Sequence, residues 1–179
     1  MSKQGAFTLI EMVAVLVLVG ILAAVAIPRL PVGGDFEGSL QARNLAGLLR
    51  LAQLRAMNDP QALQSTAPLE RCGVIAVTTN GVSISSNCQS SSLLEDMTSL
   101  DPNLWLGVEL PVSASITLPF VLQFGEVASD TNYLSESSRL GRPFVNTGTG
   151  YQSLVTRLQI TLAGKTVLIE PEGYIHVAP

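Results

Sequence analysis

Charged residues and histidine are both scarce in this chain of 179 residues. Only 13% of the residues are charged, against roughly 25% in an average soluble domain. The single histidine, His176, excludes a metal site built from several histidines of one chain. Neither a Gly-x-Ser-x-Gly nucleophile turn nor a phosphate-binding glycine loop occurs. Glu126 and Asp130 match no calcium-binding spacing. We therefore expect no enzyme, no metal and no cofactor.

Basic residues are also too few for a nucleic-acid binder. Acidic residues outnumber basic ones by 14 to 10, whereas a dedicated nucleic-acid binder needs a basic stripe. The nearest approach to such a stripe is Arg43, Arg50 and Arg55, which we interpret as the solvated face of a helix. We therefore expect no nucleic-acid partner.

Charge is missing altogether between Met12 and Ile27, where only Gly20 interrupts the aliphatic and alanine residues. The apolar stretch from Phe7 to Pro28 is longer than the 7–15 apolar residues of a secretory signal peptide. A plain membrane anchor fits its length, because about 20 residues span the hydrocarbon core. An anchor leaves Glu11 unexplained, since a carboxylate inside a spanning helix costs roughly 2.5–3.5 kcal/mol.

The string Gly5-Ala6-Phe7-Thr8-Leu9-Ile10-Glu11 offers a third interpretation. It resembles the processing site of type IV prepilins and of type II secretion pseudopilins. In that family a prepilin peptidase cuts before the apolar run, usually after a glycine, and methylates the new N-terminus. A glutamate follows four places after the new first residue. The resemblance covers the motif and the helix that follows it, and it is highly specific.

The processing site departs from the family pattern by one residue, because Ala6 separates Gly5 from Phe7. A cut after Ala6 makes Phe7 the first residue and keeps Glu11 and Pro28 at the family spacing. A cut after Gly5 keeps the glycine but shifts Glu11 and Pro28 by one place. We favour the cut between Ala6 and Phe7, so that residues 1–6 form the leader.

The resemblance implies roles for several of these residues. Glu11 of one subunit would pair with the N-terminal amine of a neighbour, which neutralises a buried carboxylate and sets the axial register. The alternative is that Glu11 only reaches the polar face of the membrane. Lys3 would hold the leader in the cytoplasm, which places the head in the periplasm. Pro28 would kink the helix or let it open locally. The implied partners are other pilin subunits, the prepilin peptidase and the inner membrane.

A breaker-rich segment, Pro31–Asp35, follows the apolar helix and predicts either a loop or an interrupted helix. Beyond it, Ser39 to Asn58 reads as an amphipathic helix that ends before Asp59-Pro60. Its buried face is predicted to carry Leu45, Leu48, Leu49, Ala52 and Ala56, with Leu51 and Leu54 widening the apolar side and Arg43 and Arg50 facing away. We interpret this helix as the spine on which a sheet packs.

The two cysteines, Cys72 and Cys88, flank a predicted hairpin. The β-rich runs 73–79 and 82–86 are joined by Asn80-Gly81, which is a strong turn signal. Two cysteines at short spacing in an exported head favour one disulfide, with two unpaired buried thiols as the alternative. A two-residue turn at Asn80-Gly81 sets Cys72 opposite position 89, so either a bulge or a frayed strand end is expected to bring its sulfur within reach of Cys88.

Further strands are predicted at 104–110, 115–124, 154–163, 165–170 and 173–177. The polar stretch between Phe124 and Leu154 predicts a functional loop, short hidden strands or disorder. His176 is expected to face solvent on the last strand, and Trp105 and the tyrosines to belong to the core. The fold class is α+β: a long N-terminal helix, partly transmembrane, packed on an antiparallel sheet or β-sandwich-like head.

The domain organisation follows from these elements: leader 1–6, transmembrane and assembly helix 7–30, linker and spine helix 31–60, and β-rich head 61–179. Resemblance to H-type pseudopilins and to FimT-like and MshC-like minor pilins favours a larger, two-sheet head.

Three functions remain open at this level. The leading one is a minor pilin that initiates or caps a filament, for instance of an MSHA-type pilus. A type II secretion pseudopilin is its alternative. A binding module carried by the filament, with the loop 125–153 contacting a surface ligand, DNA or secreted cargo, belongs to another class. A membrane-anchored enzyme has no residue in its favour.

Overall fold

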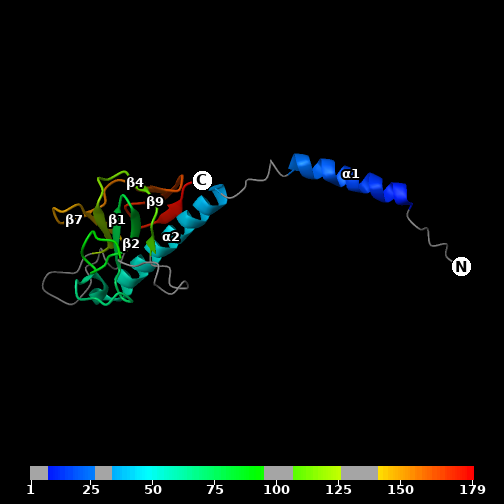
Figure 1. The fold of residues 1–179 in the computed structure, drawn as a ribbon. Coiled ribbons are helices and arrows are strands. Elements are labelled where there is room, and N and C mark those ends of the chain that lie inside the picture. Colours follow the sequence, from blue (N-terminus) through cyan, green and yellow to red (C-terminus); the bar gives the residue numbers. More distant parts are fainter. Residues whose placement is uncertain (1–7, 27–33, 95–106, 126–140) are drawn as a thin grey trace. The chain divides into compact units, whose positions relative to one another are not determined.

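The structure, a computed structural model, describes residues 8–26, 34–94, 107–125 and 141–179. The chain divides into two compact units, Met1–Phe36 and Glu37–Pro179. The first contains helix α1, Leu9–Ala26. The second is the head, in which helix α2, Gly34–Asn58, accompanies two antiparallel sheets from Glu37 onward (Figure 1). The predicted α+β class is confirmed.

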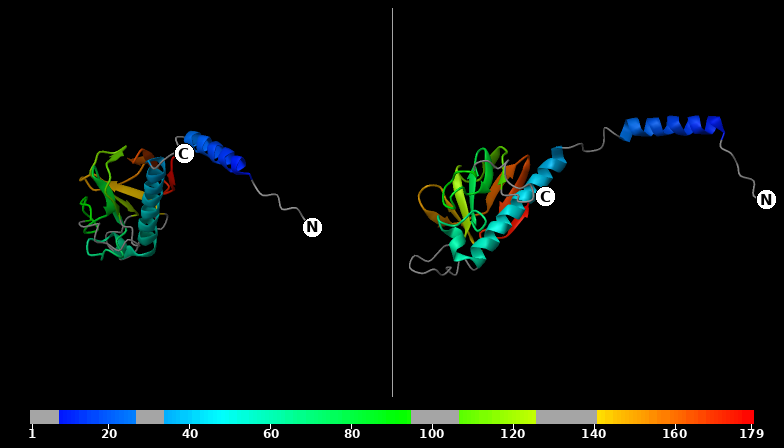
Figure 2. Two further views of the ribbon diagram at one scale, coloured as in Figure 1. Left: turned by 45° about the vertical axis from the view of Figure 1, so that its right-hand side comes forward. Right: turned by 60° about the horizontal axis from the view of Figure 1, so that its bottom comes forward.

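Helix α2 follows the predicted apolar periodicity. Leu45, Leu48, Leu49, Ala52 and Ala56 are all buried, and they form the side of the core that α2 contributes. Figure 2 shows α2 lying along one side of the sheets. The helix ends at Asn58 as predicted, and the carboxylate of Asp59 then caps a 3-10 turn, η2 (Pro60–Leu63), by accepting a hydrogen bond from the Gln61 backbone.

Two predictions for this helix were wrong. The helix begins at Gly34 rather than Ser39, so Gly34 and Asp35 are helical; positions 31–33 of the predicted linker lie outside the described residues. The early turns are stabilised by packing, because Gly38 is buried against the carbonyl oxygen of Ala163. Leu54 was expected to widen the apolar side, yet 56% of it is exposed. Its position on the helix turns it away from both sheets.

The described residues form ten strands in two antiparallel sheets. The six-stranded sheet has the order β3-β2-β1-β5-β6-β7, and the four-stranded sheet has the order β10-β9-β8-β4. The strands of the first sheet are β1 (Val74–Thr78), β2 (Gly81–Ile84), β3 (Gly107–Val108), β5 (Phe120–Phe124), β6 (Pro143–Asn146) and β7 (Tyr151–Ser153). Those of the second are β4 (Val112–Ala114), β8 (Leu158–Leu162), β9 (Lys165–Ile169) and β10 (Ile175–Val177).

Each run that was predicted to form a strand contains one, but the bounds differ from those predicted and further strands are present. The run 115–124 yields a strand only from Phe120, because Pro119 has no N–H to contribute to a sheet ladder. Strands β4, β6 and β7 were not predicted individually. β6 and β7 lie in the polar stretch after Phe124, so its described part contains short strands; positions 126–140 lie outside the described residues.

The first hairpin has a different turn from the predicted one. Thr78 pairs with Gly81, so the turn residues are Thr79 and Asn80, and Gly81 belongs to strand β2. Gly81 is needed there because a Cβ would collide with the carbonyl oxygen of Val108 on β3. Gly81 is therefore required by the close approach of β3 rather than by the turn. The local sequence of the turn gives no sign of that contact.

Tyr151 on β7 predicts a pH dependence of stability. Its hydroxyl is buried without a hydrogen-bond partner among the described residues, and burial raises the pKa of Tyr151 to about 12. The fold keeps the phenol neutral, so Tyr151 contributes a pH-dependent part of the free energy of unfolding. This part is fully present below pH 10 and is lost as pH rises through about 12.

Urea unfolding of the native chain and of Tyr151→Phe tests this dependence. At pH 7 the variant should be at least as stable, since it removes an unpaired buried hydroxyl. Between pH 10 and 12 the native chain should lose stability relative to the variant. Parallel curves over that interval would show that the Tyr151 phenol is not protected by the fold.

Candidate functional site

Helix α1 starts with a capping arrangement. Thr8 precedes the first helical residue, and its backbone N–H donates a hydrogen bond of 3.4 Å to Oε2 of Glu11. A Thr-x-x-Glu start of this kind is the capping-box pattern, in which the glutamate satisfies a donor that the helix leaves unpaired. Glu11 is also the only acidic residue of the first turn, where the helix dipole favours negative charge. This capping role of Glu11 was not predicted from the sequence.

Helix α1 is apolar on every side. Each described side chain from Thr8 to Ala24 is exposed within the single chain. The large apolar ones are Leu9, Ile10, Met12, Val13, Val15, Leu16, Val17, Leu18, Val19, Ile21 and Leu22. Exposing so continuous an apolar surface to water is unfavourable. A helix that is hydrophobic all round is therefore expected to be buried against other apolar groups.

Within the described part of the chain, no helix has both the length and the apolar character needed to cross a membrane. The transmembrane role assigned to residues 7–30 stays a prediction. The cleavage residues Gly5, Ala6 and Phe7, and the assembly residue Pro28, lie outside the described residues.

Helix α2 holds two segments of the head through polar side chains that bond to three backbone carbonyl groups. Gln53 Nε2 donates hydrogen bonds of 2.9 Å to the carbonyl oxygens of both Gly141 and Gly173. Arg50 Nη2 donates a bond of 2.8 Å to the carbonyl oxygen of Ile175 on β10. This set, which we call the α2 clamp, ties the start of β6 and the turn before β10 to one helix.

The three arginines of α2 were expected to form a solvated face, but two of them bond to the backbone of the head. Arg43 is exposed, but Arg50 belongs to the clamp, and Arg55 Nη1 donates a bond of 2.8 Å to the carbonyl oxygen of Cys72. Burial lowers the pKa of Arg55, and the nearby charge of Glu70 opposes that shift. An arginine remains charged under such a shift, so Arg50 and Arg55 anchor the head rather than attract a ligand.

Nothing in the local sequence identified the α2 clamp. Gln53 lies between apolar positions of an amphipathic helix, and its partners are 88 and 120 residues away. The nearest signals were Gly141 and Gly173 themselves, which both take positive φ values.

The predicted disulfide is present. Cys72 and Cys88 are joined, with their Cα atoms 5.6 Å apart, and both are buried. Extending the register of β1 and β2 sets Cys72 opposite Asn87 rather than residue 89. Cys88 reaches it through a left-handed backbone conformation, with φ 59. The disulfide closes the base of the hairpin as expected, and the backbone at Cys88 supplies the required irregularity.

A metal-binding cluster is not found among the described residues. Groups of three or more His, Cys, Asp or Glu side chains able to hold a metal ion are absent from the described ranges. His176 lies on β10 as predicted, but it is half-buried, stacked on the Tyr174 ring at 4.9 Å between centroids. Trp105, Glu126 and Asp130 lie outside the described residues.

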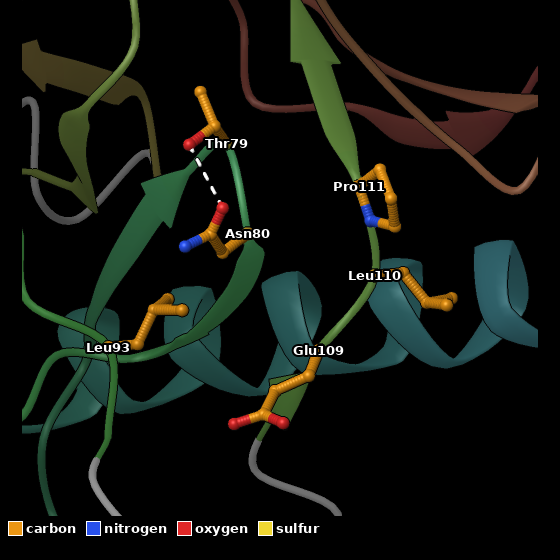
Figure 3. Close-up of a pocket in the computed structure, with 6 residues that line it drawn as sticks. All are labelled: Thr79, Asn80, Leu93, Glu109, Leu110 and Pro111. Atoms are coloured by element: carbon orange, nitrogen blue, oxygen red, sulfur yellow. Dashed lines mark hydrogen bonds between the residues drawn. The ribbon is translucent and has the colours of Figure 1, made fainter.

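A surface pocket of about 530 Å³ lies beside the β1–β2 turn. It is lined by Thr79, Asn80, Leu93, Glu109, Leu110 and Pro111. In Figure 3 the Glu109 carboxylate points away from Thr79 and Asn80, whose side chains bond to each other over 3.2 Å. Among the described residues that line this pocket, Glu109 is the one carboxylate, and a single carboxylate makes no acid–base pair.

Comparison with known families gives one match. Residues 1–27 match the family model described as the prokaryotic N-terminal methylation motif. This match supports the type IV prepilin-like family indicated by the string from Gly5 to Glu11. It also indicates processing by a prepilin peptidase, assembly with other pilin subunits and a membrane-anchored precursor. No curated protein and no solved structure matches the chain.

Proposed function

We propose that this chain is a non-catalytic structural subunit, a minor pilin or pseudopilin, of a type IV-type pilus or pseudopilus. The observation that carries the proposal is the methylation motif over residues 1–27, which includes helix α1, a helix that is apolar on all sides. Such a helix needs cover, and a bilayer and a bundle of like helices are the two environments that provide it.

The subunit has two successive states in this proposal. The precursor lies in the inner membrane through its N-terminal helix, with the head in the periplasm. The peptidase removes residues 1–6, and the subunit then enters the filament, where Glu11 pairs with the N-terminal amine of a neighbour.

The size of the head favours a rare subunit that initiates or caps the filament. A six-stranded and a four-stranded sheet on one helix agree with the two-sheet heads to which the sequence was likened. A pilus minor pilin, for instance of MSHA type and FimT-like or MshC-like, therefore stands ahead of a type II secretion pseudopilin.

The intact mass of the protein recovered from membranes, with and without the host prepilin peptidase, tests the proposal. We expect a peptidase-dependent loss of residues 1–6 and a methylated N-terminus at Phe7. Loss of residues 1–5 keeps the function but moves the cut to follow Gly5. An uncleaved chain, or one trimmed beyond Pro28, would mean an ordinary anchor or signal peptide and would refute the filament role.

A further inference from the structure

A second surface pocket of the head, of about 230 Å³, has an uncharged polar lining. Gln89 and Ser91 line it from the segment that follows Cys88, which we call the disulfide loop, and Asn146 and Thr147 line it from the β6–β7 turn. Among the described residues of its lining there is neither an acidic nor a basic side chain. The polar side chains are two amides and two hydroxyls, and each of them can both donate and accept hydrogen bonds.

The same pocket has an apolar side. It is formed by Pro119, just before strand β5, and by Val121 within that strand. Val121 pairs with Asn146 across the β5–β6 ladder, so an apolar surface lies directly beside an amide. A ligand that matches this lining offers C–H groups on one side, hydrogen-bonding groups on the other, and no charge.

Three polar side chains of the lining are available to a ligand. Within the described part of the chain, the side chains of Gln89, Ser91 and Thr147 form no hydrogen bond. They belong to two loops that are more than fifty residues apart in the sequence, and the fold brings them to one concave site. Such convergence of a few polar groups in a pocket is the usual form of a small-ligand site.

Both loops are held in shape by asparagine side chains. Directly after the disulfide, Asn87 Oδ1 accepts bonds from the backbone N–H groups of Gln89, at 3.2 Å, and Ser90, at 2.7 Å. In the β6–β7 turn, Asn146 Oδ1 accepts a bond of 2.8 Å from the backbone N–H of Gly148. A site whose backbone is already ordered loses less conformational entropy when a ligand binds.

Charge distinguishes this pocket from two others on the head. The pocket beside the β1–β2 turn contains Glu109, and a pocket of about 290 Å³ at the end of α2 contains the Arg71–Asp59 ion pair. In the uncharged pocket an ionic ligand would lose hydration without gaining an opposite charge. A neutral ligand with several hydroxyl groups instead exchanges its bonds to water for bonds to amides and hydroxyls.

Size narrows the ligand further. A volume of about 230 Å³ is below the roughly 300–1,000 Å³ of pockets for drug-sized ligands, so the pocket accepts one small unit. A sugar ring combines hydroxyl groups along its edge with C–H groups on its face, as the two sides of the lining require. We infer that the pocket between the disulfide loop and the β6–β7 turn binds one neutral sugar unit of a glycan.

This inference goes beyond the proposed filament role and does not rest on it. Asn146 and Thr147 belong to the polar stretch 125–153, for which contact with a surface ligand was one prediction. The disulfide loop was not part of that prediction, because its position beside the β6–β7 turn depends on the fold.

Saturation-transfer NMR on the full chain, in a detergent without a sugar headgroup, tests the inference. The neutral probes are the methyl glycosides of glucose, galactose, mannose and N-acetylglucosamine. Glucuronic acid, glucosamine and N-acetylalaninamide are the anionic, cationic and peptide-like comparisons. We expect at least one neutral glycoside to bind with a Kd of about 1–10 mM, as suits a few hydrogen bonds to one ring. Its Kd should not change between about 50 and 500 mM NaCl, because no charge is involved.

Two pairs of variants locate the binding. Gln89→Ala and Thr147→Val each remove a hydrogen-bonding group from the pocket and should each raise the Kd about tenfold. The matched controls are Gln152→Ala and Thr149→Val, which change exposed residues outside the lining and should leave the Kd unaltered. All four positions are at least partly exposed outside the core, so the thermal midpoint should stay within about 2 °C of the native chain.

Several results would overturn the inference. One is the absence of binding by every neutral glycoside at about 100 mM, far above the expected Kd. Others are tighter binding of a charged probe, binding of N-acetylalaninamide alone, which would make this a peptide site, and glycoside binding that the pocket variants do not weaken. Peptidase processing should be the same in all four variants, so a failure of sugar binding leaves the filament role standing and can be told apart from its failure.

Discussion

Gly173→Ala is expected to lower the free energy of unfolding of the head by about 3 kcal/mol, from backbone strain and overpacking together. Gly173 has φ +92, which an L residue rarely adopts, and its Cβ would collide with the carbonyl oxygen of Gly141. The same Cβ would lie 2.8 Å from Gln53 Nε2, so the substitution also disrupts the α2 clamp. Urea unfolding of the purified full chain in detergent, followed by circular dichroism, measures the change.

Gly148→Ala is the matched control for this prediction. Gly148 has φ +107, but nothing lies within 4 Å of an added Cβ. It therefore carries the backbone cost alone, about 1–2 kcal/mol. If the two variants are equally destabilised, the close approach of Gly141 to Gly173 does not limit the stability of the head, and the importance assigned to the clamp is wrong.

Glu11→Gln is expected to reduce incorporation into filaments about a hundredfold or more, since removing one partner of a buried ion pair costs ~3–5 kcal/mol. In the proposed filament, the physical reason is the loss of the negative charge that would neutralise a neighbour's N-terminal ammonium. Glutamine is isosteric and still accepts the hydrogen bond from the Thr8 backbone in the capping box, so helix α1 keeps its start. Quantifying sheared filaments against membrane-bound subunits gives the measurement.

Glu11→Ala separates the two roles of this side chain. It removes both the charge and the cap, and the lost cap adds about 1 kcal/mol to the cost. Val13→Ala, at an exposed apolar site of the same helix, should assemble normally. Normal assembly of Glu11→Gln together with a defect in Glu11→Ala would assign Glu11 to capping alone and would remove the proposed ion pair.

Much of the helical part was open to prediction because its signals are local. The signals are the charge-free stretch from Met12 to Ile27, the Glu11 that precedes it, and the spacing of Leu45, Leu49, Ala52 and Ala56, and all of them are properties of neighbouring residues. Helix periodicity depends on contacts three and four residues apart, so it can be read without knowledge of the fold.

The division of the strands into two sheets could not be predicted from local signals in the same way. The described part of the stretch after Phe124 reads as polar loop, yet it contributes β6 and β7 to the sheet that holds β1. Short strands with few apolar residues give a weak local pattern, and their pairing with distant strands stabilises them. The turn of the first hairpin differed from the predicted one for a related reason, because Gly81 allows strand β3 to approach closely.

By itself the sequence determined the methylation motif at the N-terminus, the buried face of α2 and the pairing of the two cysteines. Only the tertiary structure decided the strand order, the register of the first hairpin and the α2 clamp. The physical reason is distance along the chain: Gln53 meets carbonyl groups 88 and 120 residues away. Such contacts depend on the packed core bringing distant segments together, and no local spacing of residues records them.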